Sequence, residues 1–148
     1  MIHLARTLTE KIEKLTGLPV KRLMKFGFVG GSGIVVNMSF FYIFNEFTSF
    51  SYKISFVFAF EISIINNFIL NTLWTWKDRK TKDKKEKKIR FFKYHLITLS
   101  AALINFLILW GLVEYFAFNK YLANLIGIFA GMSINFLVNH KWTFKKIP

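Results

Sequence analysis

The chain contains no cysteine, and only 8 of its 148 residues are Asp or Glu. The missing cysteine excludes disulfide bonds, thiol catalysis and cysteine-based metal sites. The sequence also lacks a Gly-rich motif that would cradle phosphate, a spacing typical of metal ligands and a nucleophile beside a base. It therefore predicts no catalytic residues, no metal site, no cofactor and no enzymatic activity.

Apolar residues are abundant instead, at 53% of the chain, with 19 phenylalanines among them. They gather in four stretches, at residues 26–47, 54–73, 94–118 and 121–138. Each is close to the roughly 20 residues with which a helix crosses a hydrocarbon core about 30 Å thick. Buried helices of a soluble protein would carry polar faces, which these stretches mostly lack. We therefore predict an all-α, integral membrane four-helix bundle over residues 21–148.

The first 20 residues follow a different pattern. Leucine and isoleucine recur at helical spacing among basic residues, and helix stop signals follow at Gly17 and Pro19. An uninterrupted apolar region and a small-residue cleavage site are both missing, which argues against a cleavable signal. The pattern predicts an amphipathic interfacial helix over residues 1–20. Packing of this helix on a partner protein is the alternative.

The basic residues indicate the orientation of the chain. With the N-terminus inside, all 21 Lys and Arg residues except Lys53 and Lys120 fall near the inner side, ten of them at 77–93. The positive-inside rule then predicts a multi-pass cell membrane protein with both termini cytoplasmic. We predict residues 77–93 to form a basic cytoplasmic loop that contacts anionic lipid headgroups rather than nucleic acid.

The sequence repeats itself at an offset of 68 residues. The pattern N-F-x-x-N-x-x-W-T-W-K at 67–77 returns as N-F-x-x-N-x-x-W-T-F-K at 135–145. The same offset places Lys25 on Lys93 and Asn37 on Asn105. We therefore predict two parallel two-helix repeats, at residues 25–77 and 93–145, related by a pseudo-twofold axis along the membrane normal.

Asparagines within the spans are the first candidates for function, because lipid cannot satisfy their amides. Asn67 and Asn71 share a face of the second predicted helix, as Asn135 and Asn139 share one of the fourth. These four either bond one helix to another or line a polar cavity near the cytoplasmic surface. Asn37 and Asn105 lie near the middle of the first and third helices and face the same two alternatives.

Glu61 is the only acidic residue well inside a predicted span, and the 68-residue offset pairs it with Phe129. An isolated intramembrane carboxylate is by default a functional hypothesis. We take Glu61 as a candidate proton-coupling group or cation site.

Several of these features resemble the GtrA-like family. The resemblance rests on Phe26-x-x-Val29-Gly30, on the two repeated Asn-to-Trp endings and on the basic middle segment, and covers roughly residues 21–145. It implies translocation of a polyprenyl-phosphate-linked monosaccharide, which a glycosyltransferase then uses in cell-surface polysaccharide or glycolipid synthesis. On this basis the candidate substrate-binding residues are Asn67, Asn71, Asn135, Asn139, Asn37 and Asn105 for the sugar and Lys25, Arg90 and Lys93 for the phosphate.

Two other functions stay open from the sequence. One is a small proton-coupled cation exporter that uses Glu61, and the other is a non-transporting membrane anchor of a polyprenyl-phosphate glycosyltransferase. Four short helices make a thin wall for a headgroup pathway, so a homo-oligomer is also expected.

Overall fold

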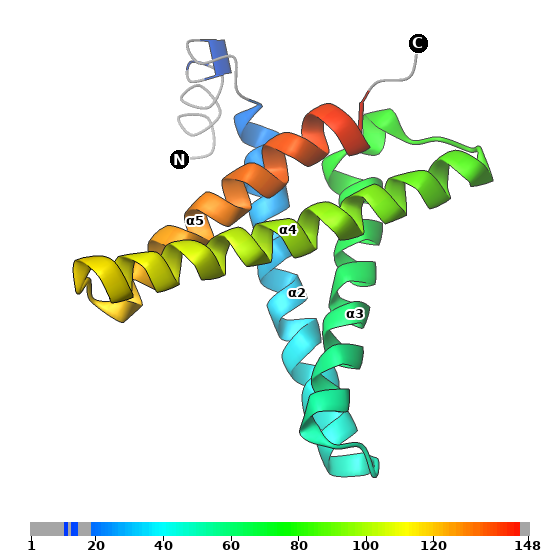
Figure 1. Cartoon of the computed structure of the whole chain (residues 1–148). Coiled ribbons are helices and arrows are strands. Elements are labelled where there is room, and N and C mark those ends of the chain that lie inside the picture. The colour runs from blue at the N-terminus through cyan, green and yellow to red at the C-terminus, as the bar shows by residue number, and fades with distance from the viewer. Residues whose placement is uncertain (1–10, 12, 15–18, 146–148) are drawn as a thin grey trace, which may run out of the picture. The chain divides into compact units, whose positions relative to one another are not determined.

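The computed structural model describes residues 11, 13–14 and 19–145, and all regular structure within them is helical (Figure 1). Four long α-helices follow one another: α2 (Val20–Phe47), α3 (Tyr52–Leu70), α4 (Lys84–Phe116) and α5 (Lys120–Val138). The all-α prediction is confirmed for this part of the chain. The interfacial helix predicted at residues 1–20 falls largely outside the described residues.

Each of the four helical segments is long and apolar enough to cross a membrane: Val20–Phe47, Ile54–Thr75, Lys84–Phe116 and Leu122–Thr143. Large apolar side chains such as Phe28, Phe92 and Phe116 are exposed along them. So much exposed apolar surface is unfavourable in water and suits contact with lipid tails. The chain is a multi-pass membrane protein.

The chain divides into two compact units after Lys77, and each unit is a helical hairpin. Hairpin one comprises residues 19–77, with α2 and α3 side by side and joined by residues 48–51 (Figure 1). Hairpin two comprises residues 78–145, with α4 and α5 joined by residues 117–119. Ala117 ends α4 in the left-handed conformation, at φ 47°, and its N–H and that of Phe118 donate to the Leu112 carbonyl.

Helix α4 begins at Lys84, ten residues before the apolar stretch predicted at 94–118. The prediction of a loop over 77–93 is therefore wrong for residues 84–93. Asp83 caps this helix, because its Oδ1 accepts the N–H of Lys85 at 2.9 Å. Glu86 then pairs with Arg90 one turn later, at 3.0 Å. A cap, an i,i+4 ion pair and a run of good helix formers extend the helix beyond its apolar part.

The buried contacts of each hairpin lie between its own two helices. In hairpin one the buried apolar side chains are Phe26, Val29, Ala59, Ile64 and Trp76. In hairpin two they are Tyr94, Ile97, Ala101, Ala123, Phe136 and Phe144. Small residues at the crossing bring the backbones close together, as is usual for helix pairs in membranes.

Candidate functional site

Helices α3 and α5 each continue into a π-helical turn, at Asn71–Thr75 and Asn139–Thr143. In each turn an N–H donates to a carbonyl five residues back, from Trp76 to Asn71 and from Phe144 to Asn139, both at 2.8 Å. These positions are 68 residues apart. Single π-helical turns within helices often occur at functional sites, because the wider turn redirects the side chains that follow.

The aromatic residue after each turn packs against an aromatic residue on the other long helix of its hairpin. Trp76 meets Phe26 edge to face, with ring centroids 5.8 Å apart, and Phe144 meets Tyr94 in the same way at 6.3 Å. Both Trp76 and Phe144 are completely buried. The π-helical turn thus anchors the basic end of each hairpin, which is the end that carries Lys25 or Lys93.

The two asparagines that begin the π-helical turns are buried and bonded within their own helices. Asn71 accepts a hydrogen bond from Thr75 Oγ1 at 2.8 Å. Asn139 uses its Nδ2 differently and donates to the carbonyl and the Oδ1 of Asn135, at 2.9 and 2.6 Å. Asn71 is 1% exposed and Asn139 is fully buried, so neither amide lies at an open surface.

A lysine lies over a tryptophan at the basic end of each hairpin. Lys25 Nζ is 5.6 Å from the centroid of the Trp74 ring, and Lys93 Nζ is 4.9 Å from that of Trp142. An ammonium group within about 6 Å of an aromatic face is held by a cation–π interaction. The indole leaves the N–H donors of the lysine free to bind an anion.

An open groove of about 420 Å³ surrounds the second of these pairs. It lies between α4 and the π-helical turn after α5, and its lining residues are Lys88, Ile89, Phe92, Lys93, Leu96 and Trp142. Four of the six are large and apolar, and the other two are cationic. Apolar walls with a few charged groups suit an amphiphile with a hydrocarbon chain and an anionic head.

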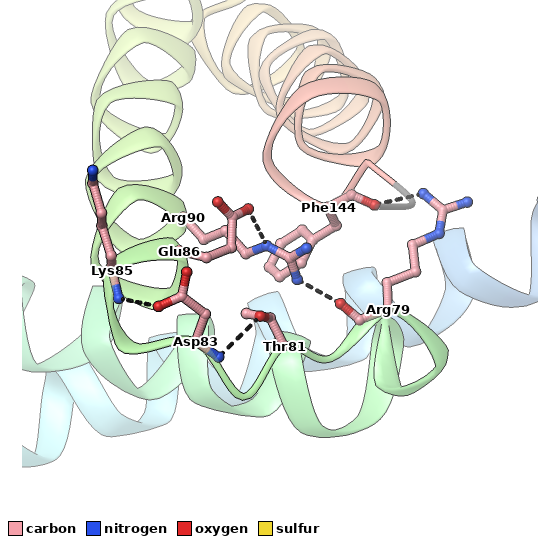
Figure 2. Close-up of polar contacts among 7 residues, drawn as sticks. All are labelled: Arg79, Thr81, Asp83, Lys85, Glu86, Arg90 and Phe144. Atoms are coloured by element: carbon pink, nitrogen blue, oxygen red, sulfur yellow. Dashed lines mark hydrogen bonds and ion pairs between the residues drawn. The ribbon is translucent and has the colours of Figure 1, made fainter. Parts of the chain in front are cut away.

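Arg90, predicted to bind phosphate, is 2% exposed and already engaged (Figure 2). Its Nε donates to Glu86 and its Nη1 to the carbonyl of Arg79. Arg79 in turn donates from Nη1 to the carbonyls of Phe144 at 2.7 Å and His140 at 2.9 Å, at the end of the fourth span. The pair of arginines ties the start of α4 to the last carbonyls after α5.

Sequence reasoning missed Arg79. The last carbonyls of a helix lack partners within it, and basic side chains often supply them. This rule indicates that the Phe144 carbonyl needs a hydrogen-bond donor. It does not indicate which of the ten basic residues at 77–93 supplies the donor, because the bond joins residues 65 positions apart.

Three of the remaining candidate asparagines, Asn67, Asn105 and Asn135, lie between the helices of their own hairpins. Asn67 packs against Gly33, and Asn105 packs against Gly127. Asn105 and Asn135 together line a recess of about 170 Å³ in hairpin two. Asn37 and Glu61 are half-buried, on α2 and α3. Across the described residues, no three His, Asp or Glu side chains come close enough to hold a metal ion.

Two helical hairpins, each with a lysine–tryptophan pair and a π-helical turn at its basic end, define a small polytopic membrane domain. Residues 25–145 match the family described as "GtrA/DPMS, transmembrane domain". The chain belongs to this family. It is also similar to "Dolichol-phosphate mannosyltransferase" from Pyrococcus furiosus, with 34% identity over 125 residues, which are 84% of this chain and 34% of that protein. The chain thus spans about a third of the length of this relative.

Proposed function

We propose that this protein moves a polyprenyl-phosphate-linked monosaccharide from the cytoplasmic to the outer leaflet of the cell membrane, for cell-surface polysaccharide or glycolipid synthesis. The observation that carries the proposal is the lysine–tryptophan pair at the basic end of each hairpin, set in hairpin two beside a groove with apolar walls. A relative named for dolichol phosphate, which is a polyisoprenoid phosphate, supports the same ligand class.

The phosphate is assigned to Lys93 and Lys88 in hairpin two and to Lys25 in hairpin one. Lysine binds phosphate as a point charge with three donors, and a charge-assisted hydrogen bond is about twice as strong as a neutral one. The prenyl chain would lie along Phe92 and Leu96, which are exposed on the groove. Arg90 is left out of the phosphate site, because its donors hold Glu86 and the Arg79 carbonyl.

Translocation requires a polar path, because moving a charged headgroup through hydrocarbon unaided is very costly. Asparagines between the helices would offer their amides to the sugar hydroxyls, while the prenyl chain stays in lipid. Asn71 and Asn139 serve this path indirectly, since their buried amides shape the π-helical turns.

The proposal includes the orientation and the duplication. Both termini would be cytoplasmic, so that the lysine–tryptophan pairs of both hairpins meet the inner leaflet. The two hairpins would be parallel copies of one unit, because their turns, aromatic contacts and lysine–tryptophan pairs recur at positions 68 apart. The transfer of the sugar would belong to a separate glycosyltransferase.

A flipping assay with the purified full chain in vesicles tests the proposal. A fluorescent polyprenyl-phosphate mannose is added, and a membrane-impermeant quencher reports how fast the label crosses. We expect Lys93→Gln to lower the rate about tenfold or more, since a charge-assisted hydrogen bond contributes about 1.5–3 kcal/mol. Lys80→Gln removes the same charge from an exposed lysine of the same segment and serves as the matched control. Equal rates for the Lys93 variant and the unaltered chain would contradict the proposed site.

A second candidate function is a membrane anchor for a polyprenyl-phosphate glycosyltransferase. It is favoured by the match to one third of a mannosyltransferase, since the matching region there is one part of a larger protein. An anchor would move no lipid in vesicles of the purified chain alone. It would instead raise the activity of a glycosyltransferase that is reconstituted with it.

A further inference from the structure

Equivalent positions in the middle of the two hairpins are packed in different ways. In hairpin one the amide of Asn67 lies directly against Gly33. Ser63 Oγ also contacts this glycine, because it donates to the Gly33 carbonyl at 3.1 Å. The space between α2 and α3 is filled at this level by an amide and a hydroxyl.

In hairpin two, the offset of 68 places Ala101 where Gly33 stands and Asn135 where Asn67 stands. A Cβ added to Gly33 would lie 2.5 Å from Asn67 Oδ1 and 2.7 Å from its Cγ, so the Asn67 side chain could not keep this position. The methyl of Ala101 therefore excludes the arrangement of hairpin one. Asn135 pairs with Asn139 instead, and Gly131, at the position of Ser63, adds no side chain.

The recess of about 170 Å³ is the space that these changes leave open. Its lining residues are Thr98, Ala101, Ala102, Asn105, Ile128, Gly131, Met132 and Asn135. No charged residue is among them. The recess therefore suits an uncharged group and not the phosphate, for which the lysines of the groove are the assigned partners.

The polar atoms of the recess match hydroxyl groups. Asn135 accepts from Asn139 through its Oδ1, which leaves its Nδ2 as a donor. Asn105 Oδ1 is buried against Gly127 and has no hydrogen-bond partner among the described residues, so its Nδ2 faces away from that glycine. Thr98 Oγ1 donates to the Tyr94 carbonyl at 2.9 Å and can still accept. Two amide donors and one acceptor beside apolar side chains fit the hydroxyls and the C–H face of a sugar ring.

We infer that hairpin two alone holds the monosaccharide ring, in this recess, and that Ala101 keeps the recess open. The identity of the ligand rests on the proposed function. Both hairpins would then bind phosphate, and only hairpin two would recognise the sugar. The difference between the hairpins would arise from Ala101, which stands where hairpin one has Gly33.

Binding of two soluble ligands to the purified full chain tests this inference. Farnesyl phosphate mannose carries the sugar, and farnesyl phosphate lacks it. We expect Asn135→Ala to weaken binding of the first about two- to tenfold, the effect of one neutral hydrogen bond, and to leave binding of the second unchanged. Asn124→Ala, at an exposed asparagine of the same helix, is the matched control. Equal weakening of both ligands, or equal affinity of the unaltered chain for both, would overturn the inference.

A second experiment, which measures thiol labelling, leaves Asn105 and Asn135 unchanged. Because the chain has no cysteine, Ala102→Cys introduces a single thiol at the recess, and Ile34→Cys places one at the equivalent position of hairpin one. We expect farnesyl phosphate mannose to slow maleimide labelling of the Ala102→Cys variant at least threefold, with no effect on the Ile34→Cys variant. Ala101→Gly should abolish this protection, because Asn135 can then fold inward as Asn67 does. Ala130→Gly controls for the loss of a helical alanine. Protection of both thiols, or of neither, would refute a site confined to hairpin two.

These outcomes are separable from the proposed function. Sugar-dependent binding and protection without any translocation in vesicles would support the recess and refute only the flipping. Translocation without any sugar dependence would refute the recess and leave the flipping in place.

Discussion

The glycines of the helices give a sharp test of the structure, because an added methyl group would meet backbone at some of them and open space at others. A Cβ on Gly127 would lie 2.8 Å from the backbone oxygen of Asn105 and closer still to its Oδ1. A Cβ on Gly131 would lie 2.8 Å from the backbone oxygen of Ala101. In contrast, a Cβ on Gly30 or Gly111 would meet nothing within 4 Å.

The magnitudes follow from two opposing effects. Overpacking a tight contact costs about 1–3 kcal/mol, and more where the obstacle is backbone. Alanine in place of a helical glycine restores about 1 kcal/mol of helix propensity. We expect Gly127→Ala and Gly131→Ala to lower the free energy of unfolding by about 1–3 kcal/mol, because α4 and α5 must move apart. Gly111→Ala should leave it unchanged or raise it by up to about 1 kcal/mol.

Gly33→Ala should fall between these two groups. The obstacle there is the side chain of Asn67, which can rotate away, although Ser63 then loses close packing at the Gly33 carbonyl. We expect a loss of about 0–2 kcal/mol. Hairpin two shows the result of such a change, since Ala101 and Asn135 coexist there.

Unfolding of the purified chain in a detergent titration, followed by tryptophan fluorescence, measures all of these variants under one condition. The four tryptophans include Trp76, which is fully buried at the basic end of hairpin one. Gly30→Ala and Gly111→Ala are the matched controls, one in each hairpin. If Gly127→Ala unfolds no more easily than Gly111→Ala, the close approach of α4 and α5 described above is incorrect.

Two further predictions concern the ends of the hairpins. Arg90→Met should lower the free energy of unfolding by about 2 kcal/mol, because Glu86 and the Arg79 carbonyl lose their hydrogen-bond donor. Lys87→Met, at an exposed neighbour, should change the free energy of unfolding little. The same detergent titration measures both variants, and equal stability of the two would contradict a structural role for Arg90. For the orientation, an impermeant maleimide added to intact cells should label Ser49→Cys and spare Lys82→Cys, and the reverse pattern would invert the proposed topology.

The sequence predicted the spans well but their ends poorly. The apolar stretch at 54–73 lies entirely within α3 and its π-helical turn, because hydropathy reports the part of a helix that contacts lipid. It cannot report where the helix itself starts. Helix α4 extends ten residues into charged sequence, because Asp83 caps it and lysines propagate it. Hydropathy and helix formation are separate properties, and they diverge at the membrane surface.

The contacts of the candidate site were beyond prediction for a different reason. Lys25 and Trp74 lie 49 positions apart, and their meeting depends on the register between α2 and α3. A repeat offset identifies which positions are equivalent but does not identify their partners. Asn71 and Asn139 show the limit, since the same residue in the same pattern bonds to Thr75 in one hairpin and to Asn135 in the other.

The distribution of differences between the hairpins supports a division of labour along the proposed pathway. At the basic end the two hairpins share the lysine over tryptophan and the π-helical turn. In the middle they differ at positions beside the recess, with Ala101 where Gly33 stands and Gly131 where Ser63 stands. Random drift would not preserve the basic end more than the middle. If both hairpins bind the anion and only one binds the sugar, the basic end is preserved in both hairpins. The middle of one hairpin can then differ from the middle of the other. This is the pattern present, and it is the reason to look for sugar recognition in hairpin two.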